Sequence, residues 1–185
     1  MVGPKSAGAA GCWCLSHRLP SPVHTKMTPD ERCAAARSLT EQPVSPGVLA
    51  YRGAEVVGWA GIAPRSEVAS ITRSTKIPVR GDGNIWALWC VKTRPGYRKQ
   101  GISHHLVRGA VTFAREHGAI AVEAYPVDNG SRRVNPTLAY VGTRGLFAAA
   151  GFAQIAETEA VSDGMPRVVM RLTFVGAEDP ALSAG

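Results

Sequence analysis

A buried strand, a basic loop and a helix follow one another in the middle of this 185-residue chain and constrain its fold more than any other feature. Residues 85–91 (IWALWCV) are apolar at every position, which is typical of a strand covered on both faces. The segment from Gly101 to His117 repeats apolar residues at helical spacing and ends at Gly118. A second apolar run, Ala119–Tyr125, follows at once. This order predicts a helical crossover between two neighbouring strands.

The segments on either side predict a mixed sheet rather than a purely parallel one. Val48–Arg52 and Glu55–Ile62 are expected to form a hairpin, and Phe152–Val161 and Arg167–Phe174 a closing antiparallel pair. Two more helices are expected, from the N-cap Thr28 to about Leu39 and from Thr143 to Gly151. The fold class is therefore α/β (α+β mixed), with a mixed, mostly antiparallel central sheet flanked by helices.

The chain is expected to form one domain over residues 1–174. Its core would be 48–174, preceded by an irregular arm (1–26) and a helix within residues 1–47, and followed by a loose tail at 175–185. Charged residues make up only 19% of the chain, which argues against wholesale disorder. The longest apolar stretch, near Val56–Ala63, is too short to cross a bilayer, and the N-terminus lacks the apolar core of a secretory signal. We expect a cytoplasmic protein with no membrane partner.

Cysteine usage indicates neither a disulfide framework nor a metal centre. The four cysteines are Cys12, Cys14, Cys33 and Cys90. Cys12 and Cys14 lie close to His17 and His24, but the spacing matches no established zinc pattern. We expect reduced, partly buried thiols and no bound metal.

The loop between the buried strand and the long helix has the properties of an anion cradle. The first amides of a helix lack acceptors and lie at the positive end of the helix dipole. Gly101 has no Cβ, so a phosphate can approach its main chain, while Ser103 adds a hydroxyl and Arg98 and Lys99 add positive charge. Neither the Walker loop nor the dinucleotide fingerprint occurs in the chain.

The run from Arg98 to Ser103 (RKQGIS) resembles the Arg/Gln-x-x-Gly-x-Gly/Ala signature of the GNAT superfamily of acyl-CoA-dependent N-acetyltransferases. Ser103 stands at the small third position. The strand before it, Pro95 and the amphipathic helix after it fit the same pattern. The later run from Leu146 to Phe152 (LFAAAGF) resembles the Leu-Tyr-x-x-x-Gly-Phe segment of that superfamily. The resemblance covers roughly residues 48–174.

The resemblance implies that acetyl-CoA is the cosubstrate and that its acetyl group passes directly to an amine. The loop would hold the pyrophosphate through the backbone of six residues: Arg98, Lys99, Gln100, Gly101, Ile102 and Ser103. Cys90 and Val91 would bind pantetheine along the strand edge. An amide near Val91 would polarise the thioester carbonyl.

The resemblance leaves the catalytic side chains open. The superfamily often uses a Tyr in the second helix to protonate the departing thiolate, but Phe147 stands at that position. Tyr140 could supply the hydroxyl if its loop folds back, or serve only in packing. Glu123 is the only carboxylate on the inner strands, so it is a candidate general base or a salt-bridged structural residue. Deprotonation through water needs neither.

The charge pattern favours a phosphorylated cofactor over nucleic acid. The chain carries a net charge of +7, and residues 65–108 contain nine Lys or Arg and two Asp or Glu, which accounts for the whole excess. The long helix bears only Arg108 and Arg115, so it lacks a basic nucleic-acid-binding face. A catalytically silent acyl-CoA-binding module is the alternative to an enzyme. The acceptor, a small-molecule amine or a protein lysine or N-terminus, the acyl-chain preference and a homodimer all stay open.

Overall fold

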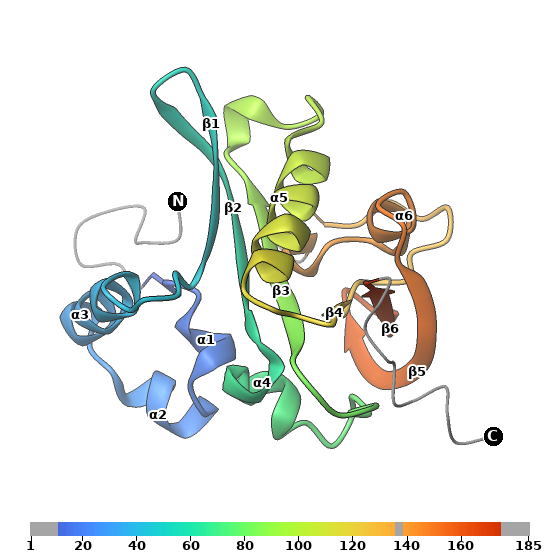
Figure 1. Ribbon diagram of the computed structural model, residues 1–185, viewed down its shortest axis with the longest axis horizontal. Helices are drawn as coiled ribbons and strands as arrows, with labels where there is room; N and C mark the ends of the chain where they lie inside the picture. Colours follow the sequence, from blue (N-terminus) through green and yellow to red (C-terminus); the bar gives the residue numbers. More distant parts are fainter. Residues whose placement is uncertain (1–10, 136–138, 175–185) are drawn as a thin grey trace.

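The computed structural model describes residues 11–135 and 139–174, and these contain one six-stranded mixed sheet flanked by helices (Figure 1). The predicted tail at 175–185 lies outside the described residues. The strands are β1 Gly47–Arg52, β2 Glu55–Pro64, β3 Ile85–Thr93, β4 Ala121–Ala124, β5 Ala153–Ser162 and β6 Met165–Thr173. The α-helices are α1 Leu15–Arg18, α2 Ser21–Lys26, α3 Pro29–Thr40, α4 Ala69–Thr72, α5 Ile102–Glu116 and α6 Arg144–Ala148. Short 3-10 turns are η1 Arg65–Glu67, η2 Pro95–Tyr97 and η3 Ala139–Val141.

The strand order is β1-β2-β3-β4-β6-β5. Only β3 and β4 pair in parallel, and α5 makes the crossover between them. All the other pairs are antiparallel. The predicted fold class, the hairpin and the closing strand pair are confirmed.

The helix predicted from Thr28 is also confirmed. The Thr28 side chain accepts from the Glu31 amide and the Glu31 carboxylate accepts from the Thr28 amide, a full capping box. The preceding arm differs from the irregular segment predicted at 1–26, because its described part contains α1 and α2. Leu15 is buried and anchors α1, while α2 has Pro22 in its first turn, where the fixed proline geometry suits a helix start.

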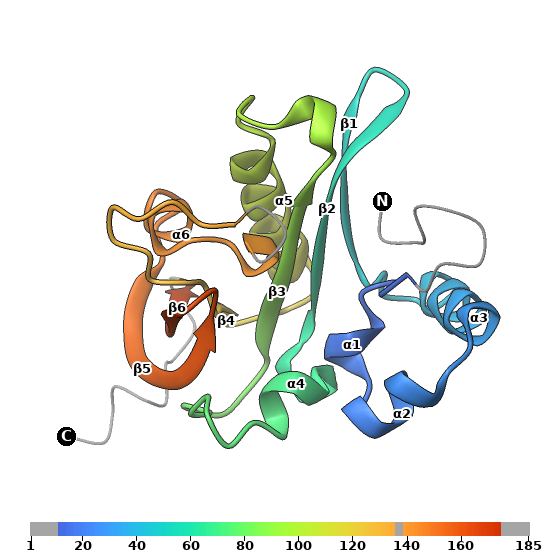
Figure 2. The same cartoon turned by 180° about the vertical axis from the view of Figure 1, so that it is seen from behind.

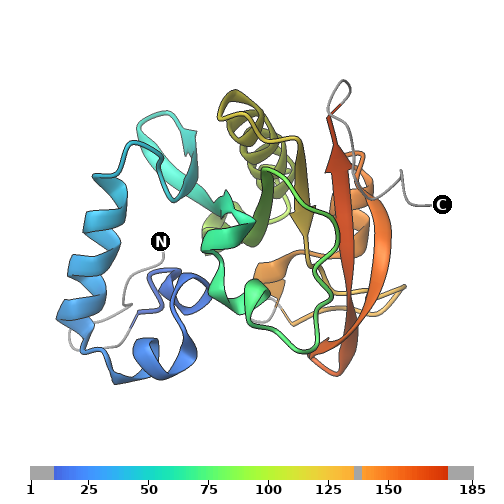
Figure 3. The ribbon, with the colours of Figure 1, turned by 60° about the horizontal axis from the view of Figure 1, so that its bottom comes forward.

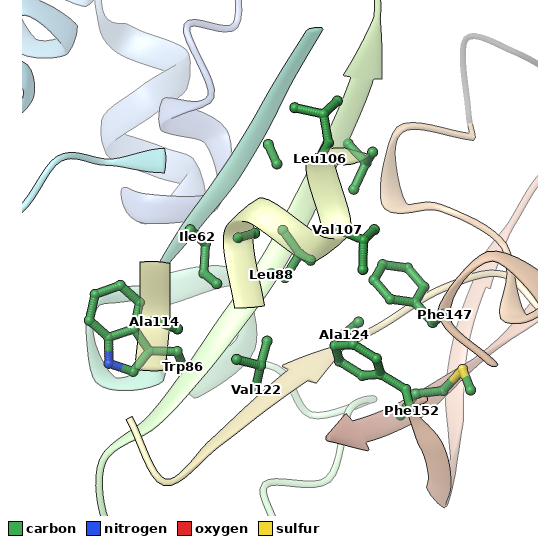
Figure 4. Close-up of a cluster of buried hydrophobic side chains, with 14 of the residues drawn as sticks. Ile62, Trp86, Leu88, Leu106, Val107, Ala114, Val122, Ala124, Phe147 and Phe152 are labelled. Atoms are coloured by element: carbon green, nitrogen blue, oxygen red, sulfur yellow. The ribbon is translucent and has the colours of Figure 1, made fainter. Parts of the chain in front are cut away.

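Two apolar layers cover the two faces of the sheet. The α5 face buries the predicted apolar stripe of the helix against Ile62, Leu88 and Val122 (Figure 4). The opposite face is covered by the arm and α4. Trp86 belongs to the first layer and Trp89 to the second, as their strand positions predict. Beyond Trp89 the register with β2 shifts by one residue, so that Cys90 lies with the second layer and Val91 with the first.

A buried charge network ties the second layer together around Glu123, whose side chain is 1% exposed. Its Oε1 accepts from Arg65 at 3.1 Å and from Nη2 of Arg171 at 2.7 Å, and its Oε2 accepts from the Tyr125 hydroxyl at 2.7 Å. Both guanidinium groups also donate to the Arg80 carbonyl oxygen. One carboxylate thereby joins β4 to β6, η1 and the segment before β3.

Glu123→Gln removes the negative charge and leaves two buried guanidinium groups without a counter-ion. We expect a loss of about 3–5 kcal/mol in the free energy of unfolding, measured by urea denaturation, because breaking a buried ion pair strands its partner. Glu159→Gln on exposed β5 is the matched control and should stay within about 0.5 kcal/mol of the wild type. Equal losses in the two variants would contradict the structural role of the network.

Candidate active site

The loop that the sequence predicts to be an anion cradle forms an open turn at the N-terminus of α5. Lys99 (φ 60°) and Gly101 (φ 75°) both adopt the left-handed conformation, which turns successive amides toward one side of the loop. In the described part of the chain, the five amides from Lys99 to Ser103 have no hydrogen-bond acceptor. A Cβ on Gly101 would meet no atom within 4 Å, so the space above this glycine is open. These properties fit a phosphate group.

The side chains of the cradle leave its amides exposed. Gln100 accepts from Arg52 at 2.6 Å and donates to the Gly96 carbonyl oxygen, so its side chain is held back against the loop. Arg98 and Lys99 are exposed and form no ion pair with a described residue. Their charge is therefore available to an anion at the cradle.

The edge of β3 that faces β4 is unpaired where the sequence predicts pantetheine binding. The parallel ladder runs only from Ile85 with Ala121 to Leu88 with Ala124. β3 then continues to Thr93, and among the described residues no strand pairs with this extension on the β4 side. Cys90 and Val91 lie in the extension. An extended, hydrogen-bonding ligand can add to such an edge.

A cleft of about 420 Å³ connects this strand edge with the cradle. Val91, Ser103 and Thr143 line it, together with Leu146 of α6. Thr143 caps α6 as predicted, with its side chain accepting from the Leu146 amide. The structure thus brings Val91 and Ser103 to one cleft, although eleven residues separate them in the chain.

The loop carrying Tyr140 folds back onto the sheet, which is the condition under which this residue was a candidate proton donor. η3 packs beside β3, and the Tyr140 ring is partly buried against the second layer. Phe147, in contrast, is fully buried in the α5 layer and contacts Phe152 edge to face. Its aromatic ring has a packing role that needs no hydroxyl.

Glu123 lies on the same face of the sheet as Tyr140, but both its carboxylate oxygens are engaged. Two cations and the Tyr125 hydroxyl occupy them, as described above. Burial and the adjacent Glu123 charge hold the pKa of Tyr125 well above its usual range, so this phenol keeps its proton. The geometry favours the structural alternative for Glu123 over the general base.

His17 reaches the same region from the N-terminal arm, a position that no local sequence pattern predicts. Its ring stacks on Trp89 with centroids 6.4 Å apart and lies 5.6 Å from the ring of Tyr140. Nδ1 is 2.9 Å from the Ser70 hydroxyl. Burial, helped by Arg167, lowers the pKa of His17 to about 4, so the imidazole is neutral at pH 7. Only a contact between segments far apart in sequence reveals this residue.

Of the two cysteines of the arm, Cys14 is buried and packs against β3, whereas Cys12 is partly buried. The Cys14 thiol donates to Cys90 Sγ at 3.6 Å, and the Trp59 indole donates to Cys14 Sγ at 3.1 Å. A hydrogen bond with Cys14 and burial raise the pKa of Cys12 far above its usual range. No cluster of three or more potential metal ligands occurs among the described residues. None of the described helices is both long enough and apolar enough to span a membrane.

Together these elements define an α/β protein that has an open amide cradle and an unpaired strand edge at one end of its central strand. A family model for the GNAT acetyltransferases matches residues 14–134. The chain belongs to this acetyltransferase (GNAT) family. A search of curated protein sequences finds no match.

Solved structures of other proteins show the same fold. A ribosomal-protein-alanine N-acetyltransferase from Brucella melitensis is 18% identical, with 80% of each chain covered and a TM-score of 0.53. A GNAT-family acetyltransferase from Streptococcus pneumoniae is 16% identical, with 80% of this chain and 79% of the other covered and a TM-score of 0.52. The yncA protein of Salmonella typhimurium, solved with its cofactor acetyl-CoA, is 16% identical, with 84% and 79% covered and a TM-score of 0.53.

The lowered pKa of His17 predicts an acid-sensitive contribution to stability. The unfolded histidine takes up a proton near pH 6.5 and the folded one only near pH 4, so the contribution is full above pH 6.5 and is lost as the pH falls toward 4. The full effect is on the order of 3 kcal/mol. In urea denaturation at several pH values, His17→Gln should flatten this part of the profile relative to the wild type. The exposed control His104→Gln should not, and parallel profiles for wild type and His17→Gln would contradict the burial of a neutral imidazole.

Proposed function

We propose that this protein is an acetyl-CoA-dependent N-acetyltransferase that transfers the acetyl group directly to an amine. The observation that carries the proposal is the run of five acceptor-free amides at the cradle, which shares one cleft with the unpaired edge of β3. Acetyl-CoA supplies the acetyl group as a thioester. The cradle fits its pyrophosphate, and the edge at Cys90 and Val91 fits its pantetheine arm.

The proposed reaction needs a neutral amine, a polarised carbonyl and a proton for the sulfur. The amide C–N bond forms as the thioester C–S bond breaks, and the proton that the amine loses balances the one that the sulfur gains. We assign carbonyl polarisation to a backbone N–H near Val91 and proton donation to the Tyr140 hydroxyl. Glu123 holds the surrounding strands, and no covalent enzyme intermediate or metal is required.

A catalytically silent acyl-CoA-binding module is the second candidate. Phe147 favours it, because this residue cannot donate a proton. The partly buried Tyr140 beside β3 favours the enzyme. We propose a cytoplasmic location and a single domain over residues 1–174. Whether the acceptor is a small molecule or a peptide amine is taken up in the next subsection.

Gly101→Glu tests the cradle, because it places a carboxylate where the pyrophosphate would lie and imposes an unfavourable positive φ. We expect the affinity for acetyl-CoA to fall at least tenfold in isothermal titration calorimetry. Gly164→Glu is the matched control for the added charge and for the positive φ, since Gly164 (φ 67°) lies in the turn between β5 and β6 with open space above it. Circular dichroism checks that both variants are folded. An unchanged affinity in Gly101→Glu would refute the cradle.

Tyr140→Phe tests the proposed proton donor. We expect kcat to fall 10- to 100-fold while the affinity for acetyl-CoA stays within twofold, since the hydroxyl acts on the leaving sulfur and not in binding. Release of the CoA thiol with a panel of amines and peptides measures turnover. Tyr51→Phe, on the exposed part of β1, is the control. Tight acetyl-CoA binding by the wild type without turnover on any acceptor would favour the silent module.

A further inference from the structure

A second and larger hollow, of about 530 Å³, lies on the sheet face opposite α5, between α3, the N-terminal arm and strands β1 to β3. We call it the aromatic groove, because Trp13, Trp59 and Trp89 all line it. Figure 3 shows α3 standing apart from the sheet on the side of the arm, and Figure 2 shows β3 from the face opposite α5. None of the residues that line the aromatic groove belongs to the cradle or lines the 420 Å³ cleft.

Two features of the aromatic groove indicate a ligand with hydrogen-bond acceptors and a flat apolar body. The indole N–H groups of Trp13 and Trp89 are buried and have no acceptor in the described part of the protein. Such unpaired donors are costly, and a ligand that accepts from them recovers the loss. The Nε1 edge of Trp89 lies against Gly61 of β2, which is not among the lining residues of the groove, so Trp13 is the donor that we assign to the ligand. Apolar and aromatic walls suit an aromatic ring.

The charge of the groove indicates that the ligand is an anion. Arg18, Arg37 and Arg94 line it, and its described lining contains no carboxylate. Arg18 pairs with Glu67 and Arg94 with Glu55. Arg37, on α3, has no ion pair among the described residues. A guanidinium group binds a carboxylate with two parallel hydrogen bonds.

The position of the groove connects it with the proposed reaction. Trp89 directly precedes Cys90 and Val91, the residues assigned to the thioester end of the cosubstrate. The neutral amine is the nucleophile, and deprotonation through water can supply it where both oxygens of Glu123 are engaged.

We propose that the aromatic groove binds the acyl acceptor and that this acceptor is a small aromatic amine carrying a carboxylate, with Arg37 as the residue that selects the negative charge. That the bound molecule is the acyl acceptor rests on the proposed function, but binding of the molecule to the groove is measurable without acetyl-CoA. It favours a free amino acid or amino acid-like molecule over a peptide N-terminus, which has no carboxylate at that place.

L-Phenylalanine is the probe, and two analogues each remove one feature. L-Phenylalanine amide lacks the charge and mimics the N-terminal residue of a peptide, and L-alanine lacks the ring. Binding is followed by the fluorescence of the groove tryptophans and by calorimetry, with no acetyl-CoA present. We expect L-phenylalanine to bind at least tenfold more tightly than either analogue. Equal or tighter binding of the amide would contradict the requirement for a carboxylate and indicate a peptide acceptor. Absence of L-phenylalanine binding would overturn the proposal.

Variants locate the site. Arg37→Ala should weaken L-phenylalanine about tenfold and leave the amide unchanged, because it removes only the charge contact. Ala36→Phe fills the groove from α3 and should abolish binding of the probe. The control Arg73→Ala removes an exposed arginine elsewhere and should have no effect. Acetyl-CoA affinity should be the same in all three variants. If the wild type does not bind acetyl-CoA, the proposed function alone is contradicted. If the affinity for L-phenylalanine is the same in Arg37→Ala, Ala36→Phe and the wild type, the aromatic groove alone is contradicted.

Discussion

The short parallel pairing of β3 with β4 is the constraint on which the rest of the structure depends. Four residue pairs join the two strands, and β3 then extends alone to Thr93. Because β4 ends at Ala124, the extension keeps an unpaired edge, and the chain leaves it through a loop whose amides are also unpaired. The Glu123 network stabilises this divergence, since it fastens β4 one residue before its end to β6 and η1. Two sets of unsatisfied backbone groups therefore meet at one cleft.

The proposed binding sites for the cosubstrate and for the acceptor lie on opposite faces of the sheet. On the α5 side, the helix start and the cleft suit the cosubstrate. On the other side, the arm brings His17, Cys14 and Trp13 over the central strand, and Tyr140 arrives from η3. The basic residues that account for the net charge of +7 lie at the two ends of β3. Arg65 forms an ion pair with Glu123. The basic residues up to Arg80 precede the start of β3, whereas the cradle follows its end. A nine-residue strand spans about 30 Å. Among residues 65–108, the basic residues that follow β3 are therefore the ones near the cradle, and Arg52 of β1 joins them through its hydrogen bond to Gln100.

Local sequence patterns predicted much of the fold and the cradle. The N-cap at Thr28, the apolar run of β3 and the missing Cβ of Gly101 are properties of neighbouring residues, so one sequence is enough to recognise them. The helices of the arm and the surroundings of Glu123 were not predictable in this way. Arg65 and Arg171 meet that carboxylate from 58 and 48 residues away, and His17 meets Trp89 across more than 70 residues. No periodicity encodes such contacts. The aromatic groove was not predictable for the same reason, since its lining comes from the arm, α3 and three strands.

Amide hydrogen exchange, with and without acetyl-CoA, tests the central claim most directly, because the claim concerns backbone N–H groups. Bound acetyl-CoA should slow exchange in two separate stretches, Lys99–Ser103 at the cradle and Trp89–Thr93 along the unpaired edge of β3. The hairpin of β5 and β6 should exchange at the same rate in both states. Protection in the cradle alone would remove the strand edge from the site. Protection in neither stretch, at concentrations where acetyl-CoA is bound, would contradict the account.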